Sequence, residues 1–424
     1  MAPELCHGRG RAAARRAAPR APPTADLLRS GGVRVLVTGS SGQLGREIAR
    51  QLAGHQQHDV LGLDLEPGPR TTHLGSITDG ALVRRLAGEV DAIVHTASLH
   101  APHVAGASEE AFAAVNVEGT RLLLEAAAAR GHRRFVYTST TSVYGSAMQA
   151  PYMLAPDRAV WVTEELEPAP RDIYDRTKLA AEALCRRAAQ GGLSAIALRT
   201  SRMFPEEGEL VAAYRLHRGV DPRDAAAAHV AALEARTPFA VLNVACTSPF
   251  GPDELVELWR DPAAVIARHC PGAAAAFAAH GWRLPTSIDR VYATGEAERL
   301  LGWRARHGLD ALLNLPGRWL YHLIEADGDA ARRRAPLHAP DSLALEGFIH
   351  CSFQPDVAES ARLHFPPGAR LLALRIDPRR LGIAAVEAPT PRGPMPHLFG
   401  PLRREAVVEV LELDAVGAAP DSLT

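Results

Sequence analysis

A tyrosine and a lysine four residues apart, Tyr174 and Lys178, are the side chains in this sequence best suited to acid–base chemistry. Residues at this spacing lie on one face of a helix, so the phenol and the ammonium would point the same way. A nearby ammonium favours the phenolate and lowers the tyrosine pKa from about 10 toward neutrality. Tyr174 is therefore a candidate general base for a substrate hydroxyl.

Lys178 is also the only lysine in the chain: of the 47 basic residues, the other 46 are arginine. A lysine kept in such a background indicates a position where a guanidinium cannot replace an ammonium. Taken alone, a Tyr-x-x-x-Lys spacing is common on ordinary solvent-exposed helices. The isolation of Lys178 favours the catalytic interpretation.

A glycine-rich segment, Thr38–Gly45, lies between a strand-like apolar run and a segment with helical spacing. Gly39 permits a tight turn, Gly42 lets a pyrophosphate approach the backbone, and Gly45 lets the helix pack closely on the strand. The helix N-terminus would face the phosphate charge. Asp64, at the end of the second predicted strand, suits the adenosine ribose hydroxyls and repels a 2′-phosphate. These features predict NAD, rather than NADP, as the cofactor.

A third segment, residues 135–145, reads as a strand that ends in a run of hydroxyl side chains. Most of these hydroxyls are expected only to cap the strand end. One of them could hydrogen-bond a substrate oxygen beside Tyr174, and we choose Thr140. The predicted catalytic set is Thr140, Tyr174 and Lys178. No HExxH motif and no Cys/His spacing indicates a metal site.

Short apolar runs alternate with helix-like segments over the first three-quarters of the chain. This alternation predicts a doubly wound (Rossmann) parallel sheet with helices on both faces, which binds ligands at the carboxyl ends of its strands. The predicted strands are residues 33–37, 60–65, 92–96, 135–138 and 195–198.

The composition changes twice along the chain. Residues 1–32 are rich in Arg, Ala and Pro without apolar periodicity, and we expect a disordered tail. Residues 33–314 are expected to form the NAD-binding domain with a small substrate-binding part. Residues 317–416 are expected to form a separate small α+β domain, with strands at residues 319–324, 347–351, 371–376 and 406–411 joined by Pro/Gly-rich connections.

The bulk properties restrict the partners. The net charge is −1, which argues against nucleic acid or an anionic membrane as the main partner. No apolar run is long enough to cross a bilayer. The cysteines are scattered without a CxxC pair, which is typical of a reduced, cytoplasmic protein. They are Cys6, Cys185, Cys246, Cys270 and Cys351.

Taken together, the motifs of residues 33–309 resemble the extended short-chain dehydrogenase/reductase superfamily, in its NAD-dependent epimerase/dehydratase group. The resemblance maps the Ser/Thr–Tyr–Lys triad of that family onto Thr140, Tyr174 and Lys178, and it gives Lys178 a second role at the nicotinamide ribose. Asn116 resembles the asparagine of the helix after strand four. The implied cofactor contacts are Gly39, Ser41, Gly42, Gln43, Leu44, Gly45, Asp64, Ala97, Tyr174 and Lys178.

The substrate suggested by this resemblance is the secondary alcohol of a sugar, nucleotide sugar or polyol. Dehydratases of the family carry an Asp-Glu pair after the catalytic threonine, whereas Thr141 and Ser142 stand here, which disfavours dehydration. Epimerase and dehydrogenase activities both remain open, and a homodimer is compatible with either. The alternatives are an NAD-sensing regulatory protein without turnover, or an activity located in the C-terminal domain.

The C-terminal region resembles a small bacterial domain family of unknown function, whose fold is thought to be related to ADP-ribosyltransferases and RNA 2′-phosphotransferases. His322, His350 and His397 lie on three separate segments and could converge on one pocket. The alternative is that each is a buried, hydrogen-bonded core histidine. Ser352 and His322 are the better candidates for contacts to a ribose or a phosphate, and the resemblance implies an ADP-ribosyl- or phosphate-handling role.

Overall fold

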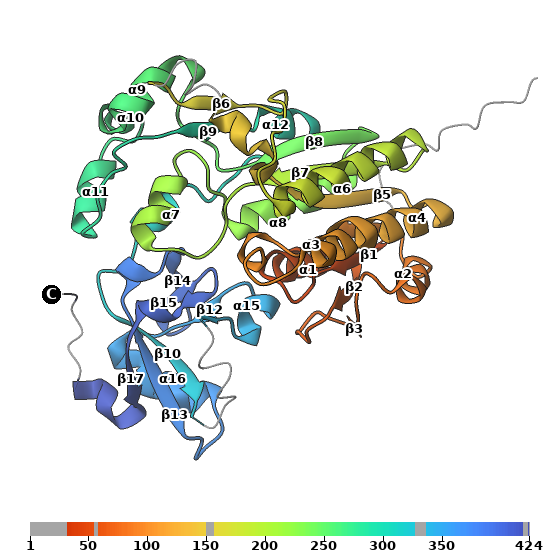
Figure 1. The fold of residues 1–424 in the computed structure, drawn as a ribbon. Coiled ribbons are helices and arrows are strands. Elements are labelled where there is room, and N and C mark those ends of the chain that lie inside the picture. The colour runs from red at the N-terminus through yellow and green to blue at the C-terminus, as the bar shows by residue number, and fades with distance from the viewer. Residues whose placement is uncertain (1–31, 55–57, 150–156, 327–335, 419–422, 424) are drawn as a thin grey trace, which may run out of the picture.

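The computed structural model describes residues 32–54, 58–149, 157–326, 336–418 and 423. Residues 1–31, which make up nearly all of the predicted tail, lie outside these ranges. In Figure 1 a layered α/β part and a smaller C-terminal part with its own sheets lie side by side.

The N-terminal part is built on a seven-stranded parallel sheet in the order β3-β2-β1-β4-β5-β7-β8. Its central strands are buried on both faces, which is why they read as continuous apolar runs in the sequence. The predicted fold class is confirmed. The strands are β1 (Val33–Thr38), β2 (His58–Asp64), β3 (His73–Leu74), β4 (Ala92–His95), β5 (Arg134–Thr140), β7 (Ala195–Thr200) and β8 (Phe239–Val244).

Helices cover both faces of this sheet. Val35 and Val37 of β1 face one core, which α1 and α8 cover, whereas Leu36 faces the other core, which α2, α4 and α6 cover. This alternation follows from the two-residue period of a strand. The helices are α1 (Gln43–Gly54), α2 (Gly80–Ala87), α3 (Glu109–Phe112), η2 (Ala113–Gly119), α4 (Thr120–Arg130), α6 (Ile173–Gln190) and α8 (Pro222–Glu234).

The order of the strands reverses between β1 and β4. From β1 the chain moves outward to β2 and β3, and it then returns to the other side of β1 through β4. Ligands of doubly wound sheets bind at such a switch point, outside the carboxyl ends of the strands. Here those ends place Thr38, His95 and Thr140 along one edge of the sheet.

Short helices and a two-stranded parallel sheet form the remainder of the N-terminal part, around a separate apolar cluster. They follow the strand ends and lie over one end of the sheet (Figure 1). These elements are β6 (Val160–Val162), α7 (Gly208–Tyr214), α9 (Leu255–Arg260), α10 (Pro262–His269), α11 (Ala273–Ala279), β9 (Arg290–Tyr292), α12 (Gly295–Leu301) and α13 (Asp310–Leu313).

The C-terminal part contains antiparallel sheets in the orders β10-β13-β17 and β12-β15-β14, together with the pair β11-β16. The β14–β15 hairpin corrects our expectation of a proline-rich connection there. The hairpin contains Pro389, Pro394 and Pro396, and because proline donates no ladder hydrogen bond these strands are hard to recognise in the sequence. The elements are β10 (Leu320–Glu325), β11 (Leu337–His338), α15 (Asp341–Leu345), β12 (Ile349–His350), α16 (Val357–His364), β13 (Leu371–Ile376), β14 (Ala385–Thr390), β15 (Gly393–Leu398), β16 (Leu402–Arg403) and β17 (Val407–Glu412).

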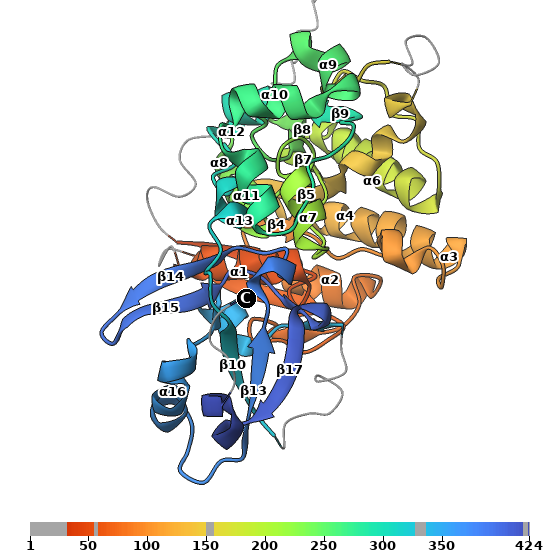
Figure 2. The same ribbon diagram turned by 90° about the vertical axis from the view of Figure 1, so that its left-hand side faces the viewer.

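The two parts contact each other through polar side chains. Arg70, after β2, donates to the carbonyl oxygens of Ala344 and Leu345 at 3.1 and 3.3 Å. Arg403 forms an ion pair with Glu207 at 3.0 Å. Figure 2 shows the C-terminal part below α1. The C-terminal part therefore touches both the dinucleotide-binding half and the segment that precedes α7.

Candidate active site and cofactor site

The glycine-rich turn after β1 is shaped by close packing. Gly39 has φ +74°, and a Cβ there would lie 2.6 Å from Thr96 Oγ1. A Cβ at Gly45 would lie 2.0 Å from the carbonyl oxygen of Gly39. At Gly42 a Cβ would meet only that same oxygen, at 3.2 Å. Packing within the protein thus explains Gly39 and Gly45, whereas the open surface at Gly42 fits the approach of a pyrophosphate.

Asp64 lies directly beside this turn, at the end of β2. Its Oδ2 accepts the backbone N–H of Ser41 at 2.9 Å, and its Oδ1 accepts that of Glu66 at 3.1 Å. Each carboxylate oxygen has further lone pairs, so Asp64 can also accept hydrogen bonds from ribose hydroxyls. These residues fit an adenosine ribose next to a pyrophosphate at the turn.

A buried histidine links β1 to β4 at the switch point. Thr120 donates to the carbonyl of Asn116, so its oxygen accepts from His95 Nε2–H at 3.0 Å. His95 Nδ1 then accepts from Thr38 Oγ1–H at 2.7 Å, and Thr38 accepts the N–H of Ala97. Burial lowers the pKa of His95 to about 3, so this ring is neutral. The chain of hydrogen bonds holds Ala97 against the glycine turn.

Asn116 fixes the loop that follows β4. Its side chain exchanges two 2.8 Å hydrogen bonds with the backbone of Leu99 and donates to Thr177 Oγ1 at 3.1 Å. Thr177 lies on α6 between the two predicted catalytic residues. Asn116 therefore ties the loop that follows β4 to α6.

Tyr174 lies in the first turn of α6, because Asp172 caps this helix by accepting the N–H of Asp175 at 2.8 Å. Thr140, the last residue of β5, forms a side-chain hydrogen bond with Tyr174. Loss of hydration raises the pKa of Tyr174 to about 12, and the contact with Thr140 opposes that rise. Two of the three predicted catalytic side chains thus meet at the edge of the sheet.

Lys178 lies one turn further along α6 and is buried. Its Nζ donates to the carbonyl of Thr138 at 2.6 Å and lies 4.7 Å from the centroid of the Tyr137 ring. Burial lowers the pKa of Lys178 to about 7. Our expectation that this ammonium lowers the pKa of Tyr174 is not met: burial dominates the pKa of Tyr174, and Lys178 interacts with β5 instead.

Sequence reasoning missed a buried ion pair beneath Lys178. Glu182, one further turn along α6, pairs with Arg199 of β7 at 2.8 Å and accepts the hydroxyl proton of Ser139 at 2.5 Å. The carboxylate of Glu182 also favours the charged form of Lys178 and so raises its pKa, against the effect of burial. The only sequence signal was the repeated spacing of four from Tyr174 to Lys178 to Glu182.

A second missed residue is His229 of α8, on the opposite face of the sheet. Its Nδ1–H donates to the carbonyl of Ala225 at 2.7 Å, so Nε2 accepts from the hydroxyl of Thr138 at 2.8 Å. Burial lowers its pKa to about 4. The backbone and side chain of Thr138 are thus held by Lys178 and His229, and nothing in the sequence paired these two residues.

Three further predicted cofactor contacts, Leu44, Ser41 and Gln43, differ in what their side chains touch. The Leu44 side chain lies in the apolar core, so only its backbone is available to a cofactor. The hydroxyl of Ser41 donates a hydrogen bond to the carbonyl oxygen of Glu66 at 2.7 Å. Gln43 lines a small cavity together with Pro222 and with Phe399 of the C-terminal part.

Comparison with protein families agrees with this architecture. Residues 35–215 match the NAD-dependent epimerase/dehydratase family, and residues 324–410 match a family described as protein of unknown function (DUF952). Residues 35–215 are therefore similar to NAD-dependent epimerases and dehydratases. The predicted family is confirmed, and with it, at the level of the family, the predicted cofactor NAD.

Curated relatives match part of the chain. An uncharacterized protein, y4nG, of Sinorhizobium fredii is 35% identical over 162 residues, which is 37% of each chain. A 3-beta-hydroxysteroid dehydrogenase of Mycolicibacterium neoaurum is 34% identical over 35% of this chain and 41% of its own length. UDP-glucose 4-epimerase 4 of Oryza sativa is 33% identical over 36% of this chain and 44% of its own length. The matched region thus spans 37–44% of the length of these relatives.

Among solved structures, a short-chain dehydrogenase/reductase superfamily protein from Agrobacterium tumefaciens with bound NAD is similar over 66% of this chain and 94% of its own. The TM-score is 0.50 at 24% sequence identity, which supports the fold. In the described part of the chain, no helix has both the length and the apolar composition needed to cross a membrane.

Proposed function

We propose that the N-terminal domain is an NAD-dependent epimerase or dehydrogenase that acts on a secondary alcohol of a sugar, nucleotide sugar or polyol. One observation carries the proposal. Lys178, the only lysine of the chain, is buried, and its Nζ donates a hydrogen bond to the carbonyl oxygen of Thr138. Thr138 lies two residues before Thr140, the strand-end residue whose side chain contacts Tyr174. Ordinary helix lysines are solvated, so a buried one beside this pair indicates a functional role.

In the proposed mechanism, Tyr174 exchanges a proton with the substrate hydroxyl. As the substrate carbon loses its hydride and the C–O bond becomes a carbonyl, the hydroxyl proton passes to the phenolate oxygen of Tyr174. The hydroxyl of Thr140 donates to that oxygen and favours the phenolate, against the effect of burial. When bound, NAD supplies the hydride acceptor. In an epimerase, Tyr174 would return the proton to the carbonyl oxygen while the hydride is restored to the opposite face of the carbonyl carbon.

Further observations argue against dehydration and against an NAD-sensing protein without turnover. Thr141 and Ser142 follow the catalytic threonine, and neither side chain can act as the acid or base that water elimination requires. An NAD-sensing protein without turnover would have no need for Tyr174 and Lys178, and both are present. The similar proteins include enzymes named for UDP-glucose and for a hydroxysteroid, so the substrate class must be tested.

The full-length protein should be assayed with NAD and three alcohols: UDP-glucose, a 3β-hydroxysteroid and a free polyol. Release of NADH would identify a dehydrogenase, and formation of an epimer without net NADH would identify an epimerase. If NAD binds but none of the alcohols reacts, the sensor interpretation replaces the enzyme.

The cofactor preference gives the first prediction. We expect NAD to bind at least tenfold more tightly than NADP, a difference of about 1.4 kcal/mol, because the Asp64 carboxylate repels a 2′-phosphate. Asp64→Ser should remove most of this preference. Glu66→Gln, which removes a neighbouring exposed carboxylate, is the matched control and should retain it. Calorimetric titration tests both variants, and equal affinities in the unmodified protein would contradict the role of Asp64.

A further inference from the structure

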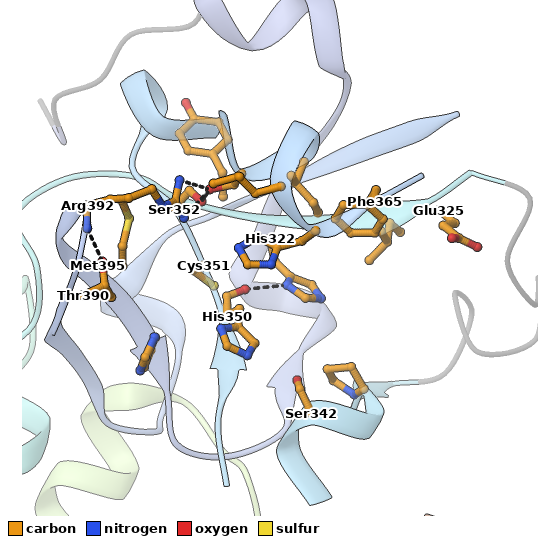
Figure 3. Close-up of a pocket in the computed structure, with 18 of the residues that line it drawn as sticks. His322, Glu325, Ser342, His350, Cys351, Ser352, Phe365, Thr390, Arg392 and Met395 are labelled. Carbon is orange, nitrogen blue, oxygen red and sulfur yellow. Dashed lines mark hydrogen bonds between the residues drawn. The ribbon is translucent and has the colours of Figure 1, made fainter. Parts of the chain in front are cut away.

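The C-terminal part encloses a cavity of about 890 Å³, well away from Tyr174 and Lys178. Strands β10, β12 and β15, helix α16 and the β14–β15 turn contribute its walls. The cavity contains all three histidines expected to converge, together with Ser352, and it adds His338 and His364. Figure 3 shows Ser352 near Arg392, with His322 and His350 further along the cavity. The side chains of His322 and Ser352 are buried, whereas His350 is exposed.

One end of the cavity holds a chain of hydrogen-bond donors. Both terminal nitrogens of Arg392 donate to Ser360 Oγ at 3.2 Å. The same oxygen lies 2.8 Å from Ser352 Oγ, so Arg392, Ser360 and Ser352 form one chain of hydrogen bonds. Ser352, Ser360 and Arg392 all line the cavity. The ion pair of Arg392 with Glu359 is long, at 3.9 Å.

His322 is held in the cavity wall by hydrogen bonds on both ring nitrogens. His322 Nδ1–H donates to the carbonyl of His350 at 2.8 Å, so its Nε2 must accept, and His338 Nε2 lies 3.0 Å from it. Burial lowers the pKa of His322 to about 3, which excludes the imidazolium at neutral pH. His397 stacks on Phe348 with ring centroids 3.9 Å apart. Among the described residues, no group of three or more His, Cys, Asp or Glu could hold a metal ion.

We propose that this cavity binds a phosphate monoester carried on an apolar or aromatic body. A guanidinium and hydroxyl groups joined at one end of the cavity suit a phosphate, which offers several acceptor oxygens and a negative charge. The remaining walls are largely apolar, with Leu323, Leu363 and Phe365 among them, and they suit the body of the ligand. Glu325 is an acidic group of the lining and lies at the opposite side from Arg392 in Figure 3. The volume lies within the range of small-molecule sites.

The test uses the full-length protein and phenyl phosphate, which has an aromatic body and a phosphate but no ribose for the Asp64 site. Calorimetric titration should show binding, with inorganic phosphate and phenol each binding more weakly. The ring resonances of the cavity histidines should shift in the NMR spectrum upon titration. Because the phosphate of this probe also suits the pyrophosphate position at the glycine turn, the cavity variants below decide where it binds, and their outcome is independent of the enzymatic proposal for the N-terminal domain.

Two variants locate the binding. Arg392→Gln should weaken phenyl phosphate binding at least about tenfold, because a charge-assisted hydrogen bond is lost. Ser352→Ala should weaken phenyl phosphate binding by a smaller factor, and it provides a second test of the cavity if the Arg392→Gln variant does not fold. Arg362→Gln, an exposed arginine of α16 outside the cavity lining, is the matched control and should bind normally. Absence of binding to the unmodified protein, or equal affinities of both cavity variants and the control, would overturn the proposal.

Discussion

Exchange of Lys178 for arginine is expected to lower kcat about a hundred- to ten-thousandfold, the range of a lost acid–base contribution. The ammonium fits a buried site where it donates to the Thr138 carbonyl at 2.6 Å and lies over the Tyr137 ring. A planar guanidinium is larger and presents its donors in a fixed fork, so it cannot take the same position. Steady-state kinetics on the alcohol identified above measures the effect, together with the melting temperature and NAD binding.

An arginine-to-lysine substitution at an exposed position of the same helix is the control. Arg176 is exposed on α6 and pairs with Glu109 at 2.8 Å, so Arg176→Lys should leave turnover unchanged. Near-normal activity of a folded Lys178→Arg variant would show that the only lysine of the chain has no catalytic role.

Replacement of Tyr174 by phenylalanine is expected to reduce kcat by a similar factor while leaving the fold intact. The change removes only the hydroxyl that contacts Thr140, so the aromatic packing of the first turn of α6 remains. NAD affinity should change by no more than a few-fold, because most of the proposed cofactor contacts come from the glycine turn and Asp64. Single-turnover kinetics separates the loss of chemistry from any loss of binding.

Tyr214 offers a matched tyrosine outside the catalytic group. Its ring lies on the Arg218 guanidinium at 4.1 Å, and Tyr214→Phe keeps that contact. We expect this variant to retain activity. Equal turnover of the Tyr174→Phe and unmodified proteins would rule out proton transfer by Tyr174.

Much of the N-terminal fold was readable from local pattern. Strands such as β1 and β4 lie between two helical layers, so apolar side chains are required on both faces and the strands stand out as continuous runs. The placement of Tyr174 and Lys178 one turn apart on α6 depends only on helical periodicity. The proline-rich hairpin β14–β15 was missed because proline is a poor indicator of a strand. The roles of the candidate site residues and the division of the chain near residue 315 stay predictions.

The sequence by itself determined the types and spacings of groups that belong to one local element: the glycine turn, the Tyr–Lys helix face and the hydroxyl run at the end of β5. Only the tertiary structure decided properties that depend on burial and on distant partners. The pKa of Tyr174 is raised because the surrounding protein removes water from it, an effect that no local pattern encodes. Arg392 and Ser352 meet through Ser360, which lies 32 positions before Arg392 in the chain, because the β14–β15 turn lies against α16.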